Sequence, residues 1–161
     1  MIIRAINTAS SSLASIIVRD GNRSAVIATG WLGAPDRIVT LGIVNGELWL
    51  IGALTSEVWA LSGDAGFPFI RITGAVVPHG CSATFGIAQT DTALFWLMRD
   101  RQGQGMIVMS SGYGVTRVST HAIEAEIQHY TTISDAIFYT RQEGGHTYLV
   151  CIFPTANVTW A

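Results

Sequence analysis

The chain has 161 residues, of which 49% are hydrophobic and only 12% are charged. Its size suits one domain with a real core, and its charged fraction is about half the usual ~25%. So little charge leaves apolar surface that we expect to meet a partner. The nine basic residues are all arginine, against eleven acids and a net charge of -2. This composition excludes the basic face of a typical nucleic-acid-binding protein, so no sequence-specific nucleic-acid binding is expected.

The two cysteines, Cys81 and Cys151, are far apart in the sequence. Their spacing fits neither a disulfide framework nor a zinc site, and we expect buried, reduced thiols as in an intracellular protein. No apolar run reaches the ~18 residues that would span a bilayer. The first 21 residues also lack the continuous apolar segment of a signal peptide.

The N-terminal part, residues 1–34, predicts only a hairpin and a loop. Two short strands are expected at 16–19 and 25–29, around the turn Asp20-Gly21-Asn22. Asp-Gly favours a hairpin turn because glycine takes positive φ without steric cost.

From residue 36 onward, a meander of four strands is expected at 37–44, 47–51, 55–61 and 69–73. Asn45-Gly46 is the strongest hairpin signal in the chain. On the second of these strands, Leu48 and Leu50 alternate with Trp49 and Ile51. Both faces of that strand are therefore apolar, which predicts a position between two packed layers.

The same cycle then repeats after a crossing loop at 75–83. Four strands are predicted at 85–89, 93–98, 106–110 and 115–118, with a polar hairpin tip at 99–105, and a third group at 135–142, 146–153 and 158–160. Four short strands about every 40 residues are typical of a β-propeller blade. The sequence therefore predicts an all-β chain of antiparallel four-stranded blades at about 36–74, 84–118 and, incomplete, 133–161. Because a propeller closes with four to eight blades, we expect a partial propeller over 35–161.

One short connector helix is predicted at 120–129. Ser119 is the expected N-cap, with Val118 and Ile123 as a hydrophobic staple. The helix has an apolar stripe that should pack on the sheets and a polar face, expected to be solvated, that carries His121, Glu124 and Gln128. A metal or catalytic site on that face is the competing interpretation, but a third ligand at suitable spacing is missing and HEXXH is absent.

Other candidate chemistry is weak. His79 and Cys81 lie close together on a loop, but adjacent loop residues seldom form a nucleophile–base pair. The glycines at 102–105 precede a strand instead of a helix N-terminus, so they do not form a phosphate loop. We therefore predict no catalytic, cofactor-binding or metal-binding residues, no cofactor and no enzymatic activity.

Ten motifs, in order, carry a resemblance to a known family: PDRIV (35–39), ELWLIG (47–52), TSEVW (55–59), SGDAGFPFIRITGA (62–75), HGC (79–81), LFWLMRDRQGQG (94–105), GYGVTRVSTHAIE (112–124), TISDA (132–136), QEGGHTYLV (142–150) and FPTANVTW (153–160). Over about 35–160 the chain resembles the packaged-DNA stabilisation proteins, also called tail accessory factors or tail hubs, of short-tailed bacteriophages and prophages. Members of that family are longer, so the resemblance implies a truncated chain.

The resemblance implies a structural virion protein, assembled in the bacterial cytoplasm and located at the head–tail junction. There it would help to seal the portal channel, retain packaged DNA and anchor tail components. Its implied partners are other copies of itself and portal or adaptor, tail needle and tail fibre or spike proteins. The residues expected to contact a protein partner are Arg99, Asp100, Arg101, Gln102, His121, Glu124 and Gln128. The alternative is a sugar- or receptor-binding propeller, which the five tryptophans suggest, although most of them are expected in the core.

Overall fold

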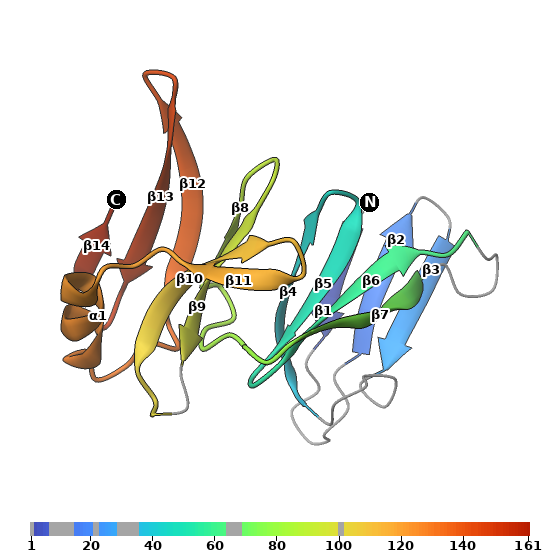
Figure 1. Ribbon diagram of the computed structural model, residues 1–161, viewed down its shortest axis with the longest axis horizontal. Helices are drawn as coiled ribbons and strands as arrows, with labels where there is room; N and C mark the ends of the chain where they lie inside the picture. The colour runs from blue at the N-terminus through green and yellow to red at the C-terminus, as the bar shows by residue number, and fades with distance from the viewer. Residues whose placement is uncertain (1, 7–14, 21–22, 29–35, 64–68, 100–101) are drawn as a thin grey trace.

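A computed structural model describes residues 2–6, 15–20, 23–28, 36–63, 69–99 and 102–161, and within them the chain is a succession of antiparallel sheets with a single helix (Figure 1). The first sheet has three strands in the order β1-β2-β3, namely β1 (Ile2–Ile6), β2 (Ser15–Asp20) and β3 (Arg23–Ala28). The hairpin β2–β3 was predicted, whereas β1 was not. The predicted turn residues Gly21 and Asn22 and the loop at 30–34 lie outside the described residues.

The second sheet is a four-stranded meander of β4 (Ile38–Val44), β5 (Glu47–Gly52), β6 (Ser56–Leu61) and β7 (Phe69–Val77). Its tight β4–β5 turn uses Asn45 and Gly46 at φ 53° and 78°, as predicted. β7 runs four residues past the predicted end at 73, so the predicted loop at 75–83 begins too early. A register shift against β6 between Glu57 and Trp59 lets the strand continue. Ala75 and Val77 at its end are then buried in the core.

Two further sheets follow the same plan. One is β8 (Ile87–Gln89), β9 (Leu94–Arg99), β10 (Gly105–Ser111) and β11 (Gly114–Arg117); the other is β12 (Ile137–Glu143), β13 (His146–Phe153) and β14 (Val158–Trp160). Helix α1 (His121–Gln128) connects them. The predicted hairpin tip at 99–105 is shorter than expected, because Arg99 and Gly105 pair with each other as strand residues. The all-β fold of propeller blades with one connector helix is confirmed.

The first strands of successive blades lie side by side. β8 contacts β4 on one side and β12 on the other. The N–H of Phe138 donates to the carbonyl of Phe85 at 2.9 Å, and the Thr140 hydroxyl donates to the carbonyl of Gln89 at 3.0 Å. These bonds join the inner edges of two blades, as expected for sheets arranged around a common axis.

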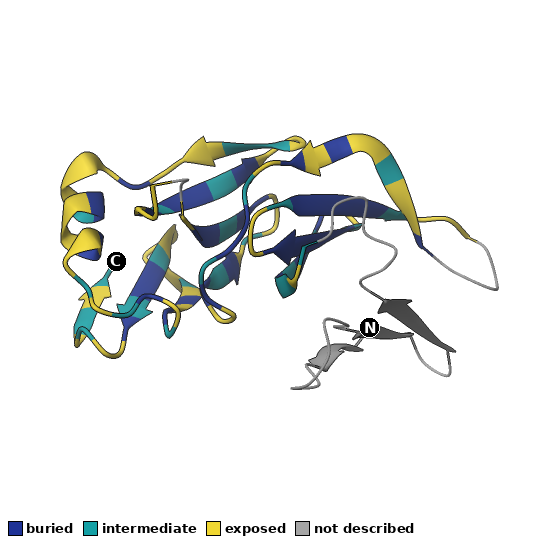
Figure 2. Cartoon of the chain, turned by 90° about the horizontal axis from the view of Figure 1, so that it is seen from below, coloured by how far each residue is buried: buried dark blue, intermediate teal, exposed yellow. Residues whose placement is uncertain are grey.

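Apolar residues are buried between the blades, and Figure 2 marks the buried positions along the strands. Between the β4–β7 and β8–β11 blades, the core is centred on Trp49, Ile51, Leu94 and Trp96. Between the β8–β11 and β12–β14 blades, it contains Leu97, Ile107, Phe138 and Phe153, together with Ile127 of α1. Strand alternation produces this layering, since neighbouring residues of β9 such as Trp96 and Leu97 enter opposite cores.

β5 is apolar on both faces, as the sequence predicts. Leu48 and Leu50 lie in a separate buried cluster with Trp59 and Phe69, on the face opposite to Trp49. The tryptophans at 49, 59 and 96 are therefore core residues.

Two glycines allow neighbouring segments of the chain to approach closely. A Cβ at Gly42 of β4 would lie 2.7 Å from the Leu94 side chain of the next blade. A Cβ at Gly80 would lie 2.3 Å from the backbone of Ala53. At Gly80 a larger residue would meet backbone and push the two segments apart, whereas at Gly42 it would require the side chains of Leu94 and Ile87 to shift.

An aspartate repeats at the entrance to two blades. Asp36, just before β4, accepts from the backbone N–H groups of Leu54 and Thr55 at 2.7 and 2.8 Å. Asp135, just before β12, accepts from the N–H of Thr155 at 2.8 Å. In both blades the carboxylate therefore ties the start of the first strand to the loop between the second and third strands.

Candidate functional site

The β9–β10 hairpin tip carries the first group of residues expected to contact a partner. Arg99 and Gln102 are exposed at the two ends of the tip. Asp100 and Arg101 lie outside the described residues. The structure thus leaves Arg99 and Gln102 on the surface, and their role in an interaction stays a prediction.

Helix α1 begins one residue later than predicted. The N-cap is Thr120, whose Oγ1 accepts from the N–H of Ile123 at 3.4 Å, so the predicted Ser119 cap is wrong. Ser119 is instead buried and used for other bonds: its hydroxyl accepts from the N–H of Ile107 at 3.0 Å. With Thr120 as the cap, the staple positions fall on Ser119 and Glu124, which are hydrogen-bonded, and not on Val118 and Ile123.

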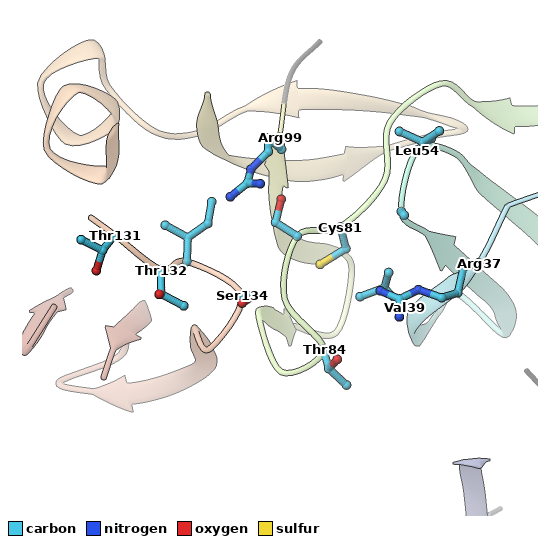
Figure 3. Close-up of a pocket in the computed structure, with 12 residues that line it drawn as sticks. Arg37, Val39, Leu54, Cys81, Thr84, Arg99, Thr131, Thr132 and Ser134 are labelled. Carbon is cyan, nitrogen blue, oxygen red and sulfur yellow. The ribbon is translucent and has the colours of Figure 1, made fainter. Parts of the chain in front are cut away.

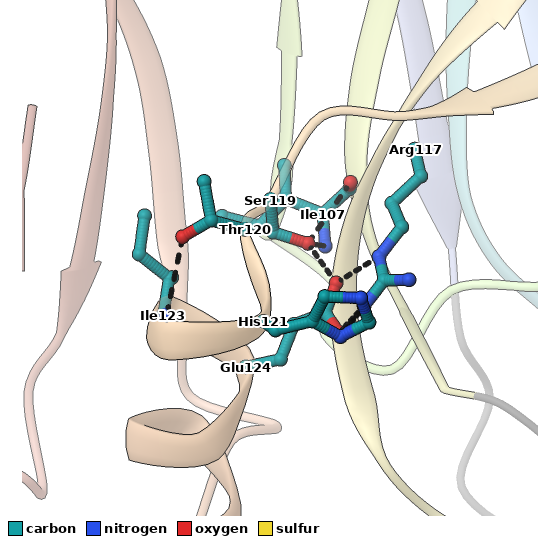
Figure 4. Close-up of polar contacts among 7 residues, drawn as sticks. All are labelled: Ile107, Arg117, Ser119, Thr120, His121, Ile123 and Glu124. Atoms are coloured by element: carbon teal, nitrogen blue, oxygen red, sulfur yellow. Dashed lines mark hydrogen bonds and ion pairs between the residues drawn. The ribbon is translucent and has the colours of Figure 1, made fainter.

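The expected solvated polar face of α1 is only partly correct, because Glu124 is 6% exposed. Its carboxylate accepts from Arg117 Nε at 2.6 Å and from the Ser119 hydroxyl at 2.5 Å, and Arg117 Nη2 also pairs with its second oxygen (Figure 4). Burial by itself raises the pKa of Glu124, but the bonds from Arg117 and Ser119 outweigh it, and the pKa lies below its usual value. This network fixes α1 to β11 within the chain.

The other polar residues of the helix do face outward. His121 and Gln128 are exposed, and His121 Nδ1 accepts from Arg117 Nη2 at 2.8 Å. The predicted apolar stripe packs on the sheets: Ile127 is buried and Ile123 and Tyr130 pack against the same core. The helix is therefore amphipathic as predicted, with Glu124 as the exception.

A pocket of about 460 Å³ lies at the ends of the blades (Figure 3). Its cationic residues are Arg37, just before β4, and Arg99, at the end of β9. Hydroxyl side chains line it from two loops: Ser82, Thr84, Thr131, Thr132 and Ser134. Figure 3 shows Arg99 reaching toward the 131–134 segment, while Arg37 enters from the opposite side. No Asp or Glu is among the described residues that line the pocket.

Sequence reasoning named Arg99 but missed this pocket, because Arg37, Arg99 and Thr132 come from three different blades. Among the described residues expected to contact a partner, Arg99 lines it. The signal available in the sequence was the position of both arginines at strand ends. Only the propeller arrangement brings those ends together.

Cys81, at the pocket wall, has the chemistry of a core thiol. Its Sγ donates to the carbonyl of Ala83 at 3.1 Å, and burial raises its pKa to about 11. A thiol in that state is a poor nucleophile at neutral pH. His79 uses its backbone carbonyl to accept from the Ser56 hydroxyl at 2.6 Å. The other cysteine, Cys151, is also buried and free, as predicted.

The described residues contain no cluster of three or more His, Cys, Asp or Glu side chains suited to holding a metal ion. Their helix is too short and too polar to cross a membrane.

Comparison with known proteins places the chain in a family. Residues 33–161 match the model of the phage stabilisation family described as bacteriophage P22 Gp10, beta-propeller. No curated protein matches the chain. The match spans the three blades β4–β7, β8–β11 and β12–β14. The chain therefore belongs to the P22 Gp10 β-propeller family of phage structural proteins.

Proposed function

We propose that the chain acts at the phage head–tail junction, where it helps to seal the portal channel, retain the packaged DNA and anchor tail components. The observation that carries this proposal is the family match over residues 33–161, together with the blade repeat in the same residues. In this proposal, residues 35–161 form the propeller region and residues 1–34 form a separate N-terminal part.

Dense packing between blades supports a mechanical role. Trp49 and Trp96 are almost fully buried between two blades, and Phe153 is buried between the next two. Interiors packed in this way are stiff and transmit load without yielding. A protein that closes a channel under pressure needs such stiffness.

The β12–β14 blade carries an apolar face that supports assembly with other proteins. Ile137 and Tyr139 of β12 and Tyr148 of β13 are each more than 40% exposed. Strand register puts them on one face, since Ile137 pairs with Ile152, Tyr139 with Val150 and Arg141 with Tyr148. The opposite face of this blade, with Phe138 and Phe153, packs on the β8–β11 blade. We assign the exposed face to contact with other copies of the chain or with other virion proteins.

The charge of the chain fits retention of DNA by closure of a channel. Binding to the phosphate backbone depends on lysine and arginine that release counterions. This chain has no lysine and a net charge of -2. In this proposal, contacts between proteins seal the channel. The residues of this chain that would make such contacts include Arg99, Gln102, His121 and Gln128.

Co-expression with the portal and adaptor proteins from the same phage genome tests this proposal. The chain is expected to co-elute with one of them in size-exclusion chromatography and to add density below the portal in electron micrographs. Elution as a separate species, together with its absence from purified particles, would contradict the proposal.

Binding of sugars through tryptophan is the second candidate, and the structure gives it little support. Trp49, Trp59 and Trp96 are buried, and Trp160 is half-buried with its Nε1 donating to the Tyr130 hydroxyl at 3.1 Å. Trp31 lies outside the described residues. Stacking on a sugar needs an exposed ring face. Titration with glycans is therefore expected to leave tryptophan fluorescence unchanged.

A further inference from the structure

The pocket at the blade ends concentrates positive charge in a chain that has little of it. Both Arg37 and Arg99 are exposed, and within the described part of the chain neither guanidinium has an ion-pair partner. Three of the other arginines have carboxylate partners: Arg71 lies near Glu57, Arg117 pairs with Glu124 and Arg141 with Glu143. Two arginines line this hollow, and no Asp or Glu is among its described lining residues, so the pocket favours an anion.

The remaining wall supplies hydrogen-bond donors. The hydroxyls of Thr131, Thr132 and Ser134 come from the loop before β12, and those of Ser82 and Thr84 from the loop before β8. Hydroxyls can donate to an anion that the guanidinium groups attract. This set of side chains matches a carboxylate or a phosphate group.

The volume of the pocket and the apolar residues in its wall favour a carboxylate on a peptide over a phosphate group of a nucleic acid. A volume of about 460 Å³ exceeds what a single small anion needs. Val39, Ala53, Leu54 and Ile133 also line the pocket, and Leu54 is 74% exposed. A nucleic acid would need a longer track of positive charge along its backbone. A peptide segment with an acidic residue next to an apolar one fits both parts of the wall.

We propose that this pocket binds an acidic segment of a partner protein, with Arg37 and Arg99, on opposite sides of the pocket, each pairing with a carboxylate of that segment. The planar guanidinium group forms two parallel hydrogen bonds to a carboxylate, which lysine cannot do. Leu54 then packs against an apolar neighbour of the acidic residue. Binding of an acidic segment is separate from the role at the head–tail junction. It depends on the chemistry of the pocket, so either one can be wrong without the other.

A peptide-binding experiment tests the proposal. The probe is a fluorescein-labelled hexapeptide with two glutamates flanked by leucines, and its matched control replaces both glutamates by glutamine. Fluorescence anisotropy at low salt is expected to show binding of the acidic peptide and about tenfold weaker binding of the glutamine peptide, a difference of ~1.4 kcal/mol. Equal binding of the two peptides, or no binding of either, overturns the proposal.

Variants of the chain locate the binding. Arg37→Gln and Arg99→Gln should each weaken acidic-peptide binding by about fivefold or more, since each removes one charged hydrogen-bonding group. Arg141→Gln is the matched control, because Arg141 is an exposed arginine on β12 that pairs with Glu143 and is outside the pocket. Its binding should stay unchanged. Melting temperatures of all three variants check that they remain folded. If Arg37→Gln and Arg99→Gln bind as the unaltered chain does, the pocket is not the site.

A nucleic-acid competitor separates the two anion sources. A short DNA duplex added at equal charge should not displace the acidic peptide. Displacement of the peptide from the unaltered chain, together with direct binding of a labelled duplex that is lost in Arg37→Gln and Arg99→Gln, would show that the pocket accepts phosphate and would overturn the carboxylate assignment.

Discussion

Trp49 of β5 and Trp96 of β9 meet between two blades with their ring centroids 6.1 Å apart and their planes tilted by 51°. This geometry is a favourable one for aromatic pairs. Trp96 also donates its Nε1 proton to the carbonyl of Gly80 at 3.2 Å, on the segment that crosses between the blades. The pair therefore joins both blades and their connection.

The change Trp96→Phe tests this junction. It removes the bond to Gly80 and part of the buried ring, so unfolding in urea should show a loss of about 1 to 3 kcal/mol. The change Phe85→Leu serves as a control, because Phe85 is 69% exposed. Its effect should stay within about 0.5 kcal/mol. Equal effects of the two changes would contradict the role assigned to Trp96.

The aspartate at the entrance to the β4–β7 blade gives a second prediction. In Asp36→Ala, the N–H groups of Leu54 and Thr55 lose a charged acceptor, which should cost about 1 to 3 kcal/mol of folding free energy. Asp91→Ala is the control, since the structure gives this exposed aspartate no hydrogen-bond partner among the described residues. Denaturant midpoints for both variants measure the difference. A midpoint for Asp36→Ala equal to that of the control would show that the carboxylate does not hold the loop.

Much of the fold follows from local patterns in the sequence. Asn45-Gly46 marks a turn because the left-handed conformation is favourable for these two residues, and the structure has both there. The alternation of Leu48, Trp49, Leu50 and Ile51 predicts two buried faces, and both exist. The end of β7 was missed because a register shift is a property of two paired strands, which one strand's sequence does not reveal.

The candidate site was harder to predict, since it depends on contacts between distant residues. Ser119 is a residue type that is common at N-caps. Its hydroxyl is instead hydrogen-bonded to the Ile107 N–H and the Glu124 carboxylate, and Thr120 caps the helix. Glu124 looks like a surface residue in a helical pattern. Only the position of Arg117 on β11 explains why it is buried. Likewise, nothing in the local sequence of Arg37 indicates that Arg99 lies across the same pocket.

The Arg117–Glu124 pair should respond unequally to changes in its two members. Arg117→Gln leaves the buried Glu124 carboxylate with an uncharged amide in place of the guanidinium donors. Glu124→Gln leaves an arginine that is 40% exposed and can be hydrated. The loss of stability should therefore be larger for Arg117→Gln, by about 1 kcal/mol or more. Urea unfolding of both variants at neutral pH measures this order. The reverse order would mean that the charge of Glu124 is not held by Arg117.

Stability should also fall in acid. The pKa of Asp135 is lowered by hydrogen bonds from Thr155, and that of Glu124 is lowered on balance by Arg117 and Ser119 despite its burial. A carboxyl group whose pKa is lower in the folded than in the unfolded chain stabilises the fold when the pH is above its unfolded pKa of about 4. That stabilisation is lost as the pH falls through the pKa of the folded state. Melting temperatures should therefore be steady from neutral pH to about pH 5 and decline below it. In Asp135→Asn this decline should be shallower. An unchanged acid profile in that variant would contradict the role of Thr155.

Stabilisation of the packaged phage particle is the role that we propose for the chain. The most direct measurement compares particles assembled by the encoding phage with and without this chain, and determines the fraction that keeps its DNA during incubation with nuclease. The proposed function predicts that particles lacking the chain package DNA but lose it, and that supplying the chain during assembly restores retention. Equal retention of DNA in both kinds of particle would contradict it.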